Sequence, residues 1–189
     1  MDGEEEVKKG PTTVKLMIRG TFTNGIPLAL LYVIAKYLDL ANYVYISLGM
    51  QYLVFLFHGL PFSSEKFYDL SGSITHFALV VASLTLTSST KSPRQIMIAL
   101  ASVIWMVRLG SFLFLRIEKD GKDGRFDHLK KNWLSFMGAW TIQALWVVLI
   151  QMPIILINTQ VDSAPITWVD YLMLATWTIA FIIEVAADV

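Results

Sequence analysis

The sequence predicts an all-α protein, a polytopic transmembrane helical bundle with about six spans. Hydrophobic residues make up 55% of its 189 residues and the mean hydropathy is +0.57, whereas about 45–50% of the residues in a soluble domain are apolar. The apolar residues gather in stretches close to the roughly 20 residues that a helix needs to cross a bilayer. Aromatic residues fall near the ends of these stretches, where amphipathic rings prefer to lie.

Six candidate spans follow one another, and no linker rich in Gly, Pro or Ser divides them. We therefore expect a cytoplasmic N-terminal tail over residues 1–16 and one transmembrane domain over residues 17–189. The tail has no short apolar core before a cleavage site, so it does not predict a signal peptide. The spans cover residues 17 or 26 to 37, 43–60, 74–87, 95–115, 133–157 and 167–188.

Three prolines bear on where these spans end. Pro61 has no amide hydrogen and disfavours helix in the residue before it, so we expect it to end the second span. Pro93 separates the third span, which is short and rich in Ser and Thr, from the fourth. Pro153 lies inside the fifth span, where we expect a kink rather than a stop.

Lysine and arginine predict the orientation of the bundle. With the N-terminus in the cytoplasm, Lys36, Lys91 and Arg94 lie on the opposite side of the membrane, and 11 of the 15 basic residues lie on the cytoplasmic side. This bias agrees with the positive-inside rule. The loop over residues 116–131 and the far end of the sixth span should therefore lie at the same membrane face.

Arg108 lies inside the fourth span, and Arg116 lies at the end of that span. A charged residue at the centre of a membrane helix costs about 2.5–3.5 kcal/mol on insertion scales, so Arg108 needs a partner. The two residues are separated by a rotation of about 80° and a rise of about 12 Å, which lets them line one groove. The pair predicts either a site for phosphate or another anion, which guanidinium binds in a forked geometry, or a structural ion pair.

Glu184 and Asp188 lie four residues apart near the end of the sixth span. On a helix they project from one face, about 6 Å apart. Two carboxylates at this spacing repel each other and need a cation or hydrogen-bond donors. They either mark the point where the helix emerges into water, or meet the arginines of the segment 108–125 or a polar ligand.

His58, Asp69 and His76 flank the turn between the second and third spans. Each could donate or accept a proton at the membrane face, or could be a residue at a helix end whose hydrogen bonds are satisfied.

The histidines show no metal-ligand spacing, and the loop EKDGKDGRFDHLKK lacks the closing Glu of a calcium loop, so no metal is predicted. Cysteine is absent, which excludes a thiolate nucleophile, and the net charge of zero gives no support for nucleic-acid binding. No P-loop or GxGxxG motif follows a predicted strand.

Five sequence motifs occur in a fixed order: FYDLSGSITH (67–76), RLGSFLFLRI (108–117), KDGRFDHLKKN (122–132), WTIQALWVVLIQMPI (140–154) and EVAAD (184–188). With these motifs, residues 60–188 resemble the polytopic membrane proteins related to steroid 5-alpha-reductases, many of which have no assigned substrate. The resemblance implies a helical bundle open to the cytoplasmic leaflet. It also implies reduction by NADPH of a carbon–carbon double bond conjugated to a ketone, in a steroid or other lipid substrate.

The same resemblance implies roles for particular residues. Arg108, Arg116 and Arg125 would face the cofactor phosphates, while Glu184 and Asp188 would hold a ribose or the nicotinamide amide. Polarising the substrate ketone needs a proton donor, for which Tyr68, Asp69 and His76 are candidates by their position. Membrane lipids would surround the protein, and the endoplasmic reticulum is the expected membrane.

One departure from the family pattern concerns the end of the chain. In the family, EVAAD is followed by a Gln-Lys pair and later by an Arg-His-Pro-Asn-Tyr stretch that supplies much of the cofactor site. This chain ends at Val189, so we expect a truncated chain that is inactive as a reductase. Two alternatives remain: a membrane methyltransferase of the same superfamily, acting on a lipidated thiol or a phospholipid, and a non-enzymatic lipid-binding bundle in which Arg108 and Glu184 form a structural pair.

Overall fold

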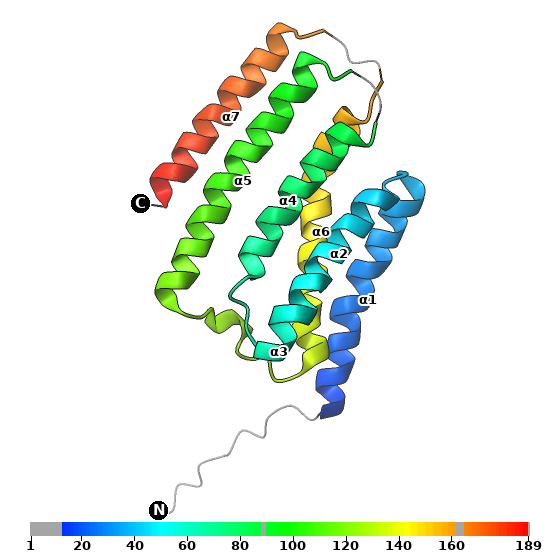
Figure 1. Ribbon diagram of the computed structural model, residues 1–189, viewed down its shortest axis with the longest axis vertical. Coiled ribbons are helices and arrows are strands. Elements are labelled where there is room, and N and C mark those ends of the chain that lie inside the picture. Colours follow the sequence, from blue (N-terminus) through cyan, green and yellow to red (C-terminus); the bar gives the residue numbers. More distant parts are fainter. Residues whose placement is uncertain (1–12, 88–89, 162–164, 189) are drawn as a thin grey trace, which may run out of the picture.

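The computed structural model describes residues 13–87, 90–161 and 165–188, and Figure 1 shows their arrangement. Of the described residues, 83% are helical and none lies in a strand. The predicted all-α fold class is therefore confirmed. The elements are α1 (Thr13–Tyr37), α2 (Ala41–Val54), the π-helix η1 (Phe55–Gly59), α3 (Leu60–Phe62), α4 (Tyr68–Thr85), α5 (Pro93–Asp120), the 3-10 helix η2 (Gly124–Phe126), α6 (Trp133–Asn158) and α7 (Trp168–Ala187).

Five of these helical segments are long and apolar enough to cross a membrane: Val14–Tyr37, Ala41–Phe62, Pro93–Asp120, Trp133–Asn158 and Trp168–Ala187. They indicate an integral membrane protein whose surface contacts lipid. Helix α4, which corresponds to the predicted short third span, is less hydrophobic than these five segments. Four of its polar residues, Ser71, Thr75, His76 and Ser83, are buried against other helices, so that these groups avoid lipid.

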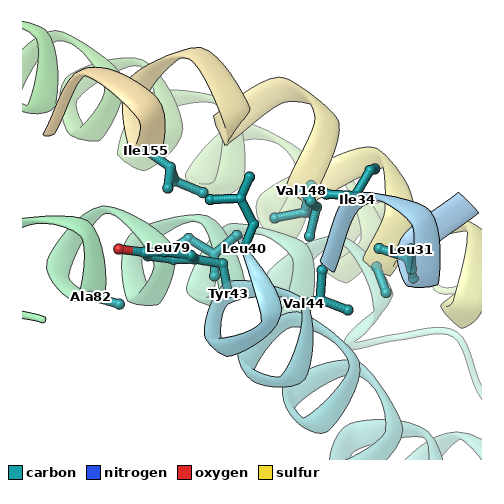
Figure 2. Packing of buried hydrophobic residues seen from close by; sticks show 11 residues of the cluster. Leu31, Ile34, Leu40, Tyr43, Val44, Leu79, Ala82, Val148 and Ile155 are labelled. Atoms are coloured by element: carbon teal, nitrogen blue, oxygen red, sulfur yellow. The ribbon is translucent and has the colours of Figure 1, made fainter. Parts of the chain in front are cut away.

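Helix α6 is the centre of the bundle. Trp140, Ala144, Val147, Val148 and Ile155 are fully buried on it, at spacings of three, four and seven residues that place them along one broad face. This face packs against α1, α2 and α4, which come from earlier parts of the chain. Figure 2 shows the packing of α6 with the other helices. The core cluster consists of Leu31, Ile34, Leu40, Tyr43, Val44, Leu79, Ala82, Ala144, Val147, Val148 and Ile155.

Buried polar side chains join the same helices. Asn24 of α1 donates to the carbonyl oxygen of Leu134 at 2.8 Å and accepts from the Thr141 hydroxyl at 2.6 Å, both on α6. Gln51 of α2 donates to Thr75 at 2.9 Å and accepts from Ser71 at 3.0 Å, both on α4. Because no water competes inside a bilayer, each such group must find its partner within the protein.

The three prolines fit the helices in different ways. Pro61 was expected to end the second span, but the helix continues through α3 to Phe62. The preceding π-helix widens the turn, with the amide of Leu60 bonded to the Phe55 carbonyl, and so accommodates the missing proline amide. Pro93 is the first residue of α5, after the capping box of Ser92. Helix α6 continues past Pro153 to Asn158, so this proline is not a stop.

Helix α7 lies along α5, and the two helices run in the same direction (Figure 1). None of the residues of α7 is buried. Its C-terminal end points in the same direction as the C-terminal end of α5. However, α7 ends beside Arg108, about 18 Å before the end of α5 at Asp120, and does not reach the loop after α5.

We predict that Asn24→Ala lowers the thermal stability of the detergent-solubilised protein. Hydrogen bonds between membrane helices contribute about 1–2 kcal/mol each, and this substitution removes two of them between α1 and α6. The transition can be followed by near-UV circular dichroism. Gly25→Ala is the matched control, because a new Cβ there meets no heavy atom within 4 Å. Equal melting temperatures for Asn24→Ala and the wild type would contradict the prediction.

Candidate functional site

A cavity between α4, α5 and α6, called the His76 cavity below, contains all three residues predicted as proton donors. Its volume is about 260 Å³. Tyr68, Asp69 and His76 come from α4, and apolar residues of α5 and α6 form most of the opposite wall. The lining residues are Tyr68, Asp69, Gly72, Ser73, His76, Met106, Leu109, Leu113, Ile142, Gln143 and Trp146.

His76 is fully buried and held in one orientation. Its Nδ1 atom lies 2.8 Å from the amide nitrogen of Gln151, which also donates to the Ser102 hydroxyl at 3.0 Å. The rings of Trp105 and Trp146 lie nearly perpendicular to the imidazole, at centroid distances of 5.9 and 5.4 Å. With Nδ1 as the acceptor, the proton of the neutral ring is on Nε2. Nε2 has no hydrogen-bond partner among the described residues.

Gln143 is a second buried polar group of this cavity, and the sequence argument did not select it. Its amide nitrogen donates to the Tyr68 carbonyl oxygen at 2.8 Å. The amide orientation is thereby determined, and Oε1 is buried with no partner within the described part of the chain. Gly72 leaves room for the Gln143 side chain, since a Cβ there would lie 2.2 Å from the Gln143 amide nitrogen. The sequence signal was the presence of Gln143 and Gln151 in an otherwise apolar span.

The Tyr68 hydroxyl already has a hydrogen-bond partner in the protein, whereas the Asp69 carboxylate is partly exposed. The Tyr68 hydroxyl donates to the Ala139 carbonyl oxygen at 3.1 Å, and its ring packs edge-on against Phe126 and Trp140. Asp69 retains 23% side-chain exposure and lies 3.8 Å from Arg116. Of the three candidates, His76 is the one that presents a buried donor without a protein partner. His58 lies apart from them, against the rings of Phe62 and Phe67.

Arg116 and Arg125 line a second, polar cavity of about 320 Å³ at the end of α5, called the Arg116 cavity below. The contact between Asp69 and Arg116 joins it to the His76 cavity, because Asp69 lines the latter. Arg125 forms a forked pair with Asp123, at 2.8 Å from Nε and 2.5 Å from Nη2. This hydrogen bonding lowers the pKa of Asp123. The lining residues are Arg116, Ile117, Asp120, Lys122, Asp123, Gly124 and Arg125.

Glu65 attaches the loop of the Arg116 cavity to the turn before α4. Its carboxylate pairs with Lys130 and accepts the amide of Asp123 at 2.7 Å, and only 4% of its side chain is exposed. Burial by itself would raise the pKa of Glu65. The hydrogen bonds from Lys130 and Asp123 outweigh it and hold the pKa below its ordinary value. Sequence reasoning missed this residue, because no local spacing relates it to partners some sixty positions later.

Arg108 lies in a separate cluster between α5 and α7. Its Nη1 atom is 2.7 Å from the Glu184 carboxylate, and Nη2 pairs with Asp188. Trp105 also donates to Glu184, at 3.0 Å. The prediction that the two carboxylates meet an arginine is confirmed, and Arg108 forms the ion pair that was one of its two alternatives. Arg108 and Arg116, which were expected to line one groove, do not share a cavity, because Arg108 does not line the Arg116 cavity.

The cluster and the His76 cavity are nevertheless neighbours. The Trp105 ring packs on His76, while its Nε1–H donates to Glu184. A change in the pairing of Glu184 can therefore reach the imidazole through one side chain. Within residues 13–87, 90–161 and 165–188, no group of three His, Asp or Glu residues is placed to hold a metal ion.

The helical bundle indicates an integral membrane protein. Residues 55–189 match the family described as Protein of unknown function (DUF1295), and the chain belongs to this family of the steroid 5-alpha-reductase-like superfamily. The matched segment contains the His76 cavity, the Arg116 cavity and the Arg108 cluster. No curated protein and no solved structure matches the chain.

We predict that the stability contributed by Glu65 depends on pH. Because its pKa is lowered in the folded state, its contribution is complete above the pKa of the unfolded chain, about 4.3, and is lost as the pH falls through the folded-state value. The melting temperature of Glu65→Gln should therefore lie below that of the wild type near neutral pH, and the gap should close in acid. Glu118→Gln, which removes an exposed pair with Lys66, should show a small gap. A gap for Glu65→Gln that is unchanged across this range would contradict the assignment.

Proposed function

We propose that the protein, in its full-length form, is a membrane-embedded, NADPH-dependent reductase of a carbon–carbon double bond conjugated to a ketone, in a steroid or other lipid. One observation carries the proposal: His76, whose buried Nε2 has no hydrogen-bond partner among the described residues, lines a mostly apolar cavity that adjoins a cavity lined by arginines. A ketone needs such a donor, and a dinucleotide phosphate needs such arginines.

The residues of the Arg116 cavity fit the phosphates of the cofactor. Arg116, Lys122 and Arg125 supply three cations against Asp120 and Asp123. In the proposed complex, the guanidinium groups of Arg116 and Arg125 bind phosphate oxygens. For Arg125 this requires exchange of its contact with Asp123, and its side chain is 71% exposed and therefore accessible. The cofactor, when bound, would supply hydride to the β-carbon of the enone.

His76 then acts on the substrate ketone. Its Nε2–H donates a hydrogen bond to the ketone oxygen and stabilises the enolate that develops there. Gln151 keeps the proton on Nε2 and fixes the ring orientation. Trp105 and Trp146 pack beside the imidazole and help to exclude water from it, which strengthens the hydrogen bond. Tyr68 and Asp69 form the end of the cavity nearest the arginines, where Asp69 contacts Arg116.

The size of the His76 cavity suits one end of a lipid, because whole-ligand cavities are usually about 300–1,000 Å³. A neighbouring apolar cavity of about 300 Å³ between α4 and α5 shares Ser73 and Met106 with it. The remainder of the substrate would lie there, with entry sideways between the two helices. The endoplasmic reticulum is the proposed membrane, in keeping with the resemblance to steroid 5-alpha-reductases.

In the reductase proposal, Arg108, Glu184 and Asp188 hold the ribose or the nicotinamide amide of the cofactor, because Trp105 connects this cluster to His76. A second candidate is a non-enzymatic lipid-binding bundle in which the cluster has only a structural role. The pairing of Arg108 with both carboxylates is the observation that favours this second candidate.

We predict that NADPH raises the melting temperature of the purified protein. A ligand at about 100 times its Kd stabilises by about 2.7 kcal/mol. Arg116→Ala and Arg125→Ala should reduce this protection and Arg108→Ala should abolish it, whereas Lys66→Ala, which removes an exposed lysine, should leave it intact.

Other outcomes of this experiment separate the alternatives. Protection by S-adenosylmethionine alone would favour the methyltransferase. If neither ligand protects, and if the loss of folded protein in Arg108→Ala is rescued by Glu184→Ala, the structural pair is supported. That result would overturn the reductase proposal.

We also predict that His76→Phe retains protection by NADPH but loses turnover. Loss of one donor to a developing oxyanion lowers kcat by about 10²–10³. NADPH oxidation in the presence of a panel of steroid and sterol enones measures this effect. His58→Phe is the control, because His58 lies outside the cavity. Turnover by His76→Phe at the wild-type rate would remove His76 from the mechanism.

A further inference from the structure

Two residues that line the His76 cavity have a buried polar atom without a partner in the described structure, and these two atoms have opposite hydrogen-bonding roles. Nε2 of His76 is a donor, because Nδ1 accepts from the Gln151 amide at 2.8 Å. Oε1 of Gln143 is an acceptor, because the amide nitrogen of the same side chain donates to the Tyr68 carbonyl oxygen at 2.8 Å. The proposed substrate ketone satisfies the donor, but a ketone has no hydrogen to offer to the acceptor.

The packing of α4 and α6 fixes the orientation of the Gln143 amide. The Tyr68 carbonyl oxygen accepts from this amide and also from the Ser71 hydroxyl, at 2.7 Å. A reversed amide would place its oxygen against that carbonyl oxygen and would leave a buried N–H in its place. The amide nitrogen lies directly against the backbone of α4, since a Cβ on Gly72 would be 2.2 Å from it. Oε1 of Gln143 is therefore held as an acceptor.

The acceptor and the donor are about one helical turn apart. Gly72, which contacts the Gln143 side chain, is four residues before His76 on α4, which corresponds to a rise of about 6 Å. On α6, Trp146 follows Gln143 by three residues, and its ring packs against the imidazole at a centroid distance of 5.4 Å. A small ligand with two polar groups can span this separation.

The other polar side chains that line the cavity already have partners. The Tyr68 hydroxyl donates to a carbonyl oxygen of α6 at 3.1 Å, and the Ser73 hydroxyl donates to the Asp69 carbonyl oxygen at 3.0 Å. The Asp69 carboxylate lies 3.8 Å from Arg116, at the arginine end of the cavity. Among the described lining residues, Gln143 therefore supplies the buried acceptor that a ligand in the cavity would satisfy.

We propose that Gln143 is a specificity-determining residue that accepts a hydrogen bond from a hydroxyl group of the substrate, so that the substrate class is a hydroxylated enone. The ketone oxygen accepts from His76, and the hydroxyl, about one helical turn away, donates to Gln143. The ketone comes from the proposed reductase function, on which this inference rests. A substrate without the hydroxyl leaves a buried acceptor unpaired, and sites that bind a hydroxyl group discriminate strongly against analogues that lack it.

Three small enones test the proposal by ligand-observed NMR titration of the detergent-solubilised protein without NADPH. 4-Hydroxycyclohex-2-enone carries a ketone and a hydroxyl on opposite carbons of one ring, its 4-methoxy ether lacks the donor hydrogen, and cyclohex-2-enone lacks the substituent. The chain has no cysteine, so the enones form no thiol adducts. We expect the hydroxy compound to bind about tenfold more tightly than either of the others, because one buried hydrogen bond is gained.

Three variants assign this preference to Gln143. Gln143→Met replaces the amide by an apolar side chain of similar length and should weaken binding of the hydroxy compound about tenfold, with the ether unchanged. Leu149→Met introduces the same residue on an outer face of α6, where Leu149 is 44% exposed, and should keep the preference. His76→Phe should weaken all three compounds by a similar factor, because each carries the ketone.

Equal binding of the three compounds by the wild type, or a preference that persists in Gln143→Met, would overturn the proposal. If Gln143→Met does not fold, the comparison of the three compounds on the wild type decides. NADPH oxidation with the same compounds is a separate measurement. A binding preference without NADPH oxidation would support the hydroxyl site and count against the reductase, whereas oxidation with equal binding would support the reductase and remove the hydroxyl site.

Discussion

Polar groups inside an apolar medium must be satisfied by other groups of the protein, and the structure depends on how this requirement is met around α6. Asn24, Gln51 and Gln151 donate and accept across helix boundaries in the centre of the bundle. These bonds are specific in direction, whereas apolar side chains meet lipid and protein with similar energies. The hydrogen bonds therefore select which helices are neighbours, and the core of Figure 2 fills the space between them.

A few buried polar atoms do not meet this requirement for a hydrogen-bond partner, and their positions point to a binding site. His76 Nε2 and Gln143 Oε1 are buried without partners in the described part of the chain, and both residues line one cavity. A buried group that lacks a partner is destabilising, so a site with two of them is suited to a ligand or to ordered water that supplies the missing bonds. The arginines beside this cavity give the proposed ligand a charged end, and the apolar wall of α5 gives it a lipid-like end.

Helix α7 differs from the other helices in how it is held. Contacts from Arg94 and Arg108 join it to α5, while its apolar residues remain outside the core. Trp105 connects one of these contacts to His76. The position of α7 and the environment of the imidazole are therefore physically connected.

The sequence alone determined the fold class, six helical segments and the existence of a partner for Arg108, because hydropathy, helix length and the cost of a buried charge are local properties. It also selected Tyr68, Asp69 and His76, although it could not show that they share a cavity. Only the tertiary structure decided that Arg108 pairs with Glu184 and Asp188 while Arg116 lies with Arg125. It alone identified Gln143 and Glu65, whose partners are distant in sequence. Such pairings depend on how the helices pack, and helix packing is not encoded in any single span.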